Sequence, residues 1–155
     1  MIPKSSTDRF VIINADDLGI TRSTNQAIFE LFENNLITSS SIMMPCVEAQ
    51  HATELHKRTN LANIGIHLTL TSAENQFIKP LYRKRKLTSL ITKEGFFPHD
   101  ISVVERNADP EEVRSELEAQ IQKAISEGIN PTHLDSHAGS VMGLNYGRDF
   151  FGNCF

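Results

Sequence analysis

Two adjacent carboxylates, Asp16 and Asp17, follow the short apolar run Phe10–Ile13. The run is too short for a helix and rich in β-branched residues, so it predicts a strand that is buried on both faces. Two neighbouring acids at the edge of an apolar core repel each other unless a cation or hydrogen bonds compensate. The pair therefore indicates a metal site beyond the carboxyl end of a strand, where ligands bind in α/β proteins. An Asx turn leading into a helix is the alternative, because Asp followed by Gly is common in turns.

A histidine lies on another predicted strand. Residues 64–70 alternate aliphatic side chains with Gly65, His67 and Thr69. If the aliphatic face packs against helices, His67 points the other way, toward a barrel lumen or a cleft. A lone histidine on a strand is often only a structural side chain. The position of His67 late in the strand, on the face without aliphatic residues, favours a functional role.

Three more candidate ligands lie in the predicted strand 132–137. In an extended chain His133, Asp135 and His137 share one face. The alternative is a polar edge strand whose histidines bond to the backbone. One carboxylate and two imidazoles form a facial metal set with positions open for water and substrate. Such a set predicts one divalent metal ion, zinc being favoured by imidazoles and magnesium being compatible with a carboxylate and waters.

Strands and helices alternate along the chain and would position these side chains. A capping box at 23–26 predicts a helix that ends near 34–35. Segment 37–44 predicts a strand and segment 48–58 a helix. The longest predicted helix begins at the N-cap Asp109 and ends at Gly128, with a buried face made by Val113, Leu117, Ile121, Ala124 and Ile125. The pattern is typical of an α/β fold with parallel strands.

The connection 71–108 is long and lacks sustained periodicity, which is typical of a binding loop or lid. Its basic residues at 83–86 indicate a solvated charge run. The turn Gly95–Pro98 carries Phe96 and Phe97, which we expect to be exposed and to bind substrate, since flat apolar rings suit stacking on sugar faces. The tail 138–155 has no capped helix and receives no assignment.

The composition limits the possible partners and compartment. The chain has 155 residues, is 39 % hydrophobic and carries a formal charge of −4, which predicts one globular domain at 1–155 and no nucleic-acid partner. Cys46 and Cys154 belong to no C-x-x-C pair, so neither a disulfide framework nor a thiolate zinc site is expected. A reducing cytoplasm fits best. We expect no export signal and no membrane helix.

Three segments together resemble the YdjC-like family of carbohydrate deacetylases. They read Asn14-Ala-Asp-Asp-Leu-Gly19, Gly65-Ile-His-Leu-Thr-Leu-Thr71 and Pro131-Thr-His-Leu-Asp-Ser-His137, in the order in which the family has them. The resemblance implies a partial (β/α) barrel of the polysaccharide-deacetylase type, which removes N-acetyl groups from amino sugars or chitooligosaccharides with one divalent metal.

The resemblance also implies roles for individual residues. Asp17, His67 and His137 match the metal ligands, and Asp16 matches the catalytic base. The metal would polarise the acetyl carbonyl and acidify a water whose proton Asp16 takes. Asp135 is expected to orient a ligand imidazole, with His133 as its neighbour in the site.

The resemblance covers roughly residues 8–140, the first half of the barrel, whereas a closed barrel usually needs about 250 residues. About four strands cannot close, so either the chain is a truncated product that lacks turnover, or another copy covers the open edge, as a homodimer or higher oligomer. The later family residues, including a histidine expected to act as general acid, have no counterpart here. Two hypotheses therefore stand beside the deacetylase: a non-catalytic metal- or sugar-binding module, and a metal-dependent phosphoesterase or oxygenase with similar ligands.

Overall fold

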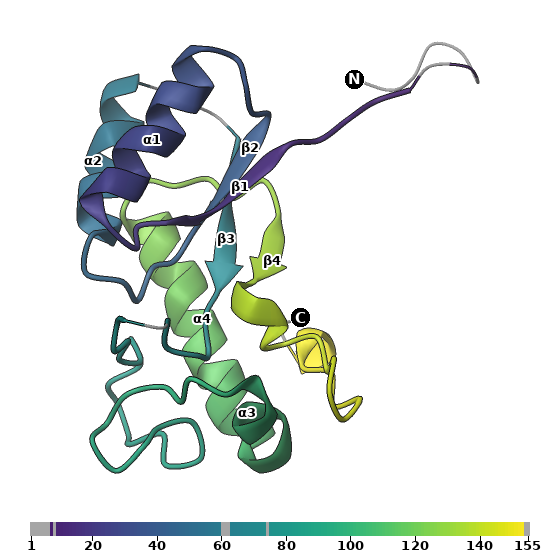
Figure 1. Ribbon diagram of the computed structural model, residues 1–155. Coiled ribbons are helices and arrows are strands. Elements are labelled where there is room, and N and C mark those ends of the chain that lie inside the picture. Colours follow the sequence, from purple (N-terminus) through teal and green to yellow (C-terminus); the bar gives the residue numbers. More distant parts are fainter. Residues whose placement is uncertain (1–6, 8, 60–62, 74, 154–155) are drawn as a thin grey trace.

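The computed structural model describes residues 7, 9–59, 63–73 and 75–153, and Figure 1 shows their arrangement. Strands and helices follow in the order β1 (Asn14–Leu18), α1 (Arg22–Glu33), β2 (Ser39–Ile42), α2 (Ala49–Thr59), β3 (Ile64–Leu68), α3 (Ile101–Asn107), α4 (Pro110–Ser126) and β4 (Leu134–Ser136). Short 3-10 turns lie at His137–Gly139 and Phe151–Asn153. The four strands are parallel and pair in the order β1-β2-β3-β4. The predicted α/β fold with an open parallel sheet is confirmed.

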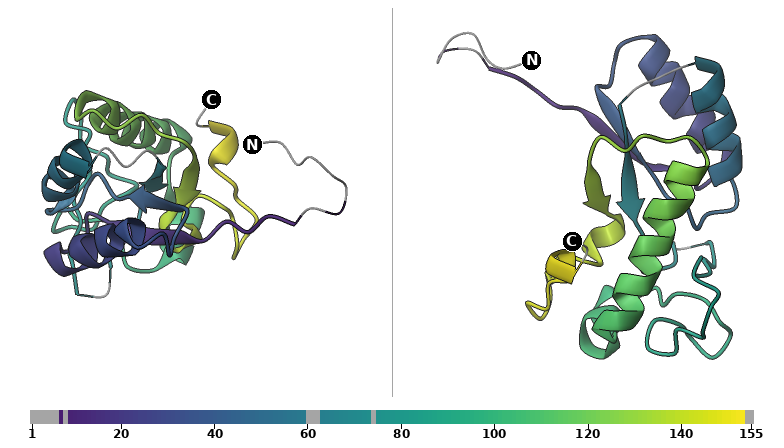
Figure 2. Two further views of the ribbon diagram at one scale, coloured as in Figure 1. Left: turned by 90° about the horizontal axis from the view of Figure 1, so that it is seen from above. Right: turned by 180° about the vertical axis from the view of Figure 1, so that it is seen from behind.

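The helices α1, α2 and α4 lie on one side of the sheet, as the views in Figure 2 show. The aliphatic side chains of β3, which include Ile64, Ile66 and Leu68, are at most 1 % exposed. They belong to the same core as Phe29 of α1 and Leu117 of α4. The prediction from the strict alternation of β3 is therefore confirmed. The aliphatic face is buried against the helices, and the side chain of His67 lies on the opposite face of the sheet.

The predicted first strand is wrong in position. β1 begins at Asn14, and the side chains of Phe10–Ile13 are 50–81 % exposed rather than buried on both faces. The backbone of Ile13 still pairs with Thr38, whose N–H donates to the Ile13 carbonyl oxygen at 2.9 Å. The physical reason is that β1 is an edge strand, and within the described residues no strand lies beyond it to cover this apolar run.

The N-cap of helix α1 lies two residues before the start of the predicted capping box. Its N-cap is Thr21, whose Oγ1 accepts a hydrogen bond from the Thr24 N–H at 3.0 Å. Asn25, which the sequence placed inside the box, is instead fully buried: its Oδ1 accepts from the Gly19 N–H and its Nδ2 donates to the Glu48 carbonyl oxygen. The predicted end is confirmed, with Asn35 in the left-handed conformation at φ 56°.

Helix α4 confirms the most detailed prediction made from the sequence. Asp109 caps it by accepting from the N–H groups of Glu111 and Glu112, and Gly128 follows its end with φ +91°. Its apolar stripe is narrower than predicted, because Ile125 is 49 % exposed. Two polar side chains, Glu116 and Gln120, are fully buried, since this face of the helix meets the long connection.

The segment 71–108 is irregular except for α3, a helix that the sequence reading missed. Carboxylates of α4 hold this segment in place. Glu116 accepts from the N–H groups of Leu81 and Tyr82, and Glu112 accepts from the N–H of Ser89. These anchors explain how a long connection without periodicity takes one conformation, since each satisfies backbone donors that would otherwise be buried without a partner.

The tail 138–153 folds as a turn against α3. An isolated antiparallel bridge joins Met142 to Asp149. The Glu105 carboxylate accepts hydrogen bonds from the N–H groups of Asn145 and Tyr146 at 3.0 and 2.6 Å. The tail therefore depends on a charged side chain of another element, which no local pattern could reveal. Cys154, the N-terminal residues 1–6 and residue 8 lie outside the described residues.

We predict that Glu116→Ala lowers the free energy of unfolding by about 2–4 kcal/mol, because it removes a buried side chain and leaves the half-buried N–H groups of Leu81 and Tyr82 without an acceptor. Urea unfolding followed by circular dichroism measures the change. The matched control is Glu118→Ala on the exposed face of α4, which removes only an ion pair with Arg114 and should cost about 0.5 kcal/mol or less. Equal losses in both variants would contradict the anchoring role of Glu116.

Candidate metal site

Three possible ligands lie together at the carboxyl end of the sheet. Asp17 comes from β1, His67 from β3, and His137 directly follows β4. One ligand atom of each lies within 4.8 Å of those of the other two. The Asp17 Oδ1 atom is 3.3 Å from His67 Nε2 and 3.2 Å from His137 Nδ1. The structure thus brings together the three residues that match the metal ligands of the family.

The backbone at the end of β1 is shaped for this arrangement. The pairing register of β1 with β2 shifts between Ala15 and Leu18, and Asp17 has φ 64°. Aspartate tolerates this left-handed conformation better than most residues do. The next turn is fixed because the Gly19 N–H donates to the buried Asn25 side chain at 2.7 Å. An irregularity at the strand end therefore lets Asp16 and Asp17 both project near the end of the sheet.

The buried His67 has a carboxylate at each ring nitrogen. Its Nδ1 lies 2.5 Å from Asp135 Oδ1, and its Nε2 faces Asp17. Burial opposes the charged ring, but the hydrogen bonds with Asp135 and Asp17 outweigh it and raise the pKa of His67 to about 9. Hydrogen bonds from His137 and His67 hold the pKa of Asp17 far below its usual range. Asp135 thus fixes the ring so that Nε2 is the nitrogen available to a cation.

A second set, made by Asp16, His67 and Asp135, also has ligand atoms within 4.8 Å. Hydrogen-bond donors already point into it. The Asn14 amide donates to Asp16 Oδ1 at 2.5 Å and to Asp135 Oδ2 at 3.3 Å, and the Ser41 hydroxyl lies 3.4 Å from Asp16 Oδ1. Donors that occupy these oxygen atoms compete with a cation. The set with Asp17 is therefore the better candidate for a cation, and we interpret the second set as a hydrogen-bonded support.

The sequence reading missed Asn14 and Ser41 as members of the site. Asn14 begins the segment 14–19 that resembles the family. An asparagine at this position is equally typical of a turn, so its residue type alone does not indicate that its amide orients a carboxylate. Ser41 lies in a run of three serines in β2, and pairing opposite Gly65 puts it beside His67, 3.2 Å from Nδ1. Only the strand register could identify it.

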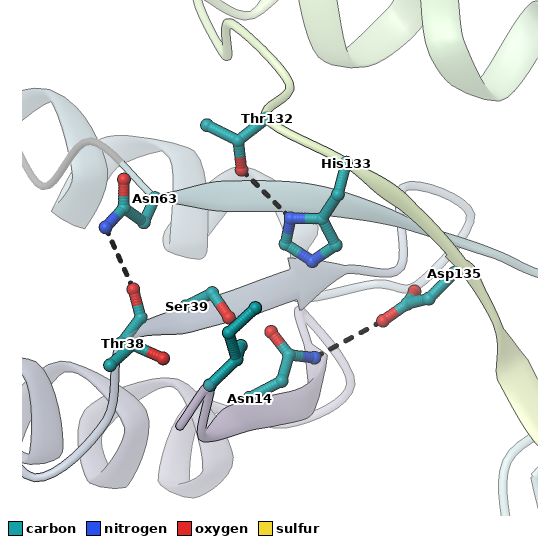
Figure 3. A pocket seen from close by; sticks show the side chains of 8 residues that line it. Asn14, Thr38, Ser39, Asn63, Thr132, His133 and Asp135 are labelled. Carbon is teal, nitrogen blue, oxygen red and sulfur yellow. Dashed lines mark hydrogen bonds between the residues drawn. The ribbon is translucent and has the colours of Figure 1, made fainter. Parts of the chain in front are cut away.

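His133 occupies a neighbouring position rather than the ligand set. Its ring lies over Gly65, where a Cβ atom would come within 2.5 Å of Nε2, so a residue without a side chain is required there. Thr132 Oγ1 lies 2.9 Å from its Nδ1. Together with Asn14, Ser39 and Asp135, His133 lines a cavity of about 580 Å³ on the open side of the sheet (Figure 3). His133 and Asp135 thus line the same cavity, and the Asn14 amide donates to both Asp135 and Asp16.

Phe96 and Phe97, which were predicted to be exposed together, differ in their exposure to solvent. Phe97 is 1 % exposed and belongs to the core, so the expectation of an exposed ring is wrong for this residue. Its side chain packs in the same core as Ile78, and its N–H donates to the Ile78 carbonyl oxygen. Phe96 remains partly exposed beside Phe77, with ring centroids 5.2 Å apart.

The donor set and its spacing suit a transition-metal ion. Two ligands of a tetrahedral zinc ion, each about 2.0–2.1 Å from the metal, lie roughly 3.3 Å apart. The distances from Asp17 Oδ1 to the two imidazole nitrogens, 3.3 and 3.2 Å, agree with this spacing. Three ligands on one side leave positions for water and substrate. The residues present therefore fit a zinc-type ion and its open coordination sphere.

A comparison with known proteins identifies the family of this chain. The model of the YdjC-like protein family matches residues 10–145, which include all three candidate ligands. The chain belongs to the YdjC-like family. Within the part of the chain that the structure describes, no helix is long and apolar enough to cross a membrane.

Relatives within the YdjC-like family carry deacetylase names. A carbohydrate deacetylase of Thermoanaerobacter pseudethanolicus is 35 % identical over 133 residues, covering 83 % of this chain and 50 % of the relative. A chitooligosaccharide deacetylase of Yersinia enterocolitica is 33 % identical, covering 84 % and 49 %. A crystal structure from Enterococcus faecalis, whose name proposes a role in cellobiose-phosphate cleavage, is 36 % identical with a TM-score of 0.73, covering 82 % and 48 %. The chain thus spans about half the length of these YdjC-like relatives.

We predict that zinc raises the melting temperature of the protein and that Asp17→Asn removes this effect, because the substitution takes one of three ligands from the set. Thermal unfolding with and without zinc, together with calorimetric titration, provides the measurement. Asp16→Asn is the matched control, since it changes the adjacent carboxylate of the second set only and should keep zinc binding. Loss of zinc binding in Asp16→Asn with retention in Asp17→Asn would reverse the assignment.

Proposed function

We propose that this chain carries the metal-binding half of a carbohydrate deacetylase, which hydrolyses the N-acetyl group of an amino sugar to acetate and a free amine. The observation that carries the proposal is the convergence of Asp17, His67 and His137 within 4.8 Å, with Asp16 beside them. The deacetylase names of the YdjC-like relatives support the reaction class. A divalent ion, when bound, would polarise the acetyl carbonyl and lower the pKa of water, which is the chemistry that amide hydrolysis needs.

Asp16 is the proposed general base. Its carboxylate is exposed to solvent, so water reaches it, and Asn14 and Ser41 fix one of its oxygen atoms through contacts at 2.5 and 3.4 Å. The other oxygen is left to accept a proton from the attacking water. Asp135 has a different task, since its hydrogen bond to His67 Nδ1 keeps this ring oriented toward Asp17.

We predict that acetate release from N-acetylglucosamine oligomers depends on added zinc and falls at least about 100-fold in Asp16→Asn, because the base is lost while the metal ligands stay in place. An enzyme-coupled acetate assay on the folded protein measures the rate. Ser115→Ala, on the exposed surface of α4, serves as a control that should leave the rate unchanged. A folded, zinc-loaded protein that releases no acetate would contradict the enzymatic proposal for this chain and favour the non-catalytic metal-binding module.

The exposed apolar run Phe10–Ile13 favours association through the edge of the sheet. Its side chains are 50–81 % exposed, and Ile12 lines the cavity on the open side of the sheet. Edge strands with exposed apolar residues pair readily with another chain. We therefore propose that a second copy covers this edge.

We predict that Ile12→Lys lowers the proportion of dimer or higher oligomer, because a charge replaces an apolar side chain in the exposed run that leads into the edge strand β1. Light scattering coupled to size-exclusion chromatography measures the mass over a range of concentrations. Val47→Lys, at a side chain that is 84 % exposed in the β2–α2 connection, is the control and should leave the mass unchanged. A wild-type protein that is monomeric at all concentrations would contradict the association.

A further inference from the structure

Three ring side chains form an aromatic platform in the segment after β3, which we define as Phe77, Phe96 and His99. The ring centroid of Phe77 lies 5.2 Å from that of Phe96 and 5.5 Å from that of His99. Phe77 is 67 % exposed, and His99 is also exposed. Burial in the core therefore does not explain the grouping of these rings.

The platform stands on a fixed base. The residues that follow Phe77 and Phe96 are buried and joined to each other, since the Phe97 N–H donates to the Ile78 carbonyl oxygen at 2.8 Å. The turn between 92 and 96 is closed by the Thr92 N–H, which donates to the Phe96 carbonyl oxygen at 2.8 Å. Buried anchors directly beside exposed rings hold the rings in one place, which lowers the entropy lost when a ligand binds.

The same base connects the platform to the candidate metal site. The buried Ser72 hydroxyl donates to the Phe97 carbonyl oxygen at 2.7 Å and accepts from the Ile78 N–H at 3.0 Å. Ser72 is only five residues after His67, a separation of at most about 18 Å in an extended chain. The segment leaves from the carboxyl end of β3, where Asp17, His67 and His137 also lie (Figure 1). The platform thus lies in the segment that continues the strand of one candidate ligand, His67.

We propose that the aromatic platform is a subsite for a distal sugar unit of an N-acetylated amino-sugar oligomer whose reacting unit lies at the metal site. This inference rests on the proposed function and adds a specificity for oligomers over the monosaccharide. Neither the platform as a whole nor Phe77 and His99 were expected from the sequence.

The shape and chemistry of the platform suit a sugar ring. A cavity of about 360 Å³ is lined by the three rings together with Thr92, Glu94 and the edge of Phe97, a volume within the range of small-molecule sites. Exposed ring faces match the apolar face of a pyranose, while the Thr92 hydroxyl, the Glu94 carboxylate and the His99 imidazole can exchange hydrogen bonds with its hydroxyl groups. Lys79, whose Nζ lies 5.0 Å from the Phe96 centroid, adds a donor beside the rings.

The test measures the affinity of the N-acetylglucosamine trimer and of the monosaccharide by isothermal titration and saturation-transfer NMR. We expect the wild-type chain to bind the trimer more tightly than the monosaccharide. Phe77→Ala should weaken trimer binding about fivefold to tenfold, with little change for the monosaccharide, because it removes a ring that is 67 % exposed. Phe96→Ala should act in the same direction. Leu36→Ala, which removes a side chain that is 60 % exposed in the α1–β2 connection, is the control and should leave both affinities unchanged.

Equal trimer affinity in wild type and Phe77→Ala, or no trimer binding at all, would overturn the subsite. The same titration with Asp17→Asn in the presence of a chelator separates this inference from the proposed function. Trimer binding that persists there and still depends on Phe77 supports the platform, even if the acetate assay shows no hydrolysis. Hydrolysis of the trimer at a rate that does not change in Phe77→Ala, with unchanged KM, would leave the deacetylase proposal intact and overturn the subsite alone.

Discussion

The contact between His67 and two carboxylates is the constraint around which the open side of the sheet is built. A buried imidazole is unfavourable when charged, and here Asp135 at Nδ1 and Asp17 at Nε2 compensate for the loss of solvent. The parallel register makes this possible, since it pairs His67 with Asp135 across β3 and β4. A shift of either strand by one residue would turn one of the two side chains to the opposite face and leave the other buried without its partner.

The polar side chains around His67 need room on this face of the sheet as well as hydrogen-bond partners. Gly65 makes room for the His133 ring, and Ser41 and Asn14 both donate to the Asp16 carboxylate. The aliphatic side chains of the same strands point into the helical layer. Each central strand therefore has two distinct faces, one that stabilises the fold and one that carries chemistry, and the cost of burying polar groups on the second face is met by hydrogen bonds among them.

The long connection after β3 is ordered by carboxylates rather than by secondary structure. Glu112 and Glu116 of α4 satisfy backbone donors of the connection, and Glu105 of α3 does the same for the tail. Buried charges of this kind are stabilising only when all their partners are in place, so they select one conformation. The same connection carries the platform of Phe77, Phe96 and His99.

The sequence by itself determined two periodic features: the alternation of β3 and the capped helix from Asp109 to Gly128. These depend on neighbours along the chain, so local spacing is enough to predict them. The sequence also indicated the family, because three segments occur in the order in which the family has them. Tertiary structure alone decided that Phe10–Ile13 is exposed, that Phe97 is buried while Phe77 is not, and that Asn14 and Ser41 support the carboxylates. Each of these depends on which residue lies opposite in a neighbouring strand or loop, and strand register and edge position are not encoded in any single segment.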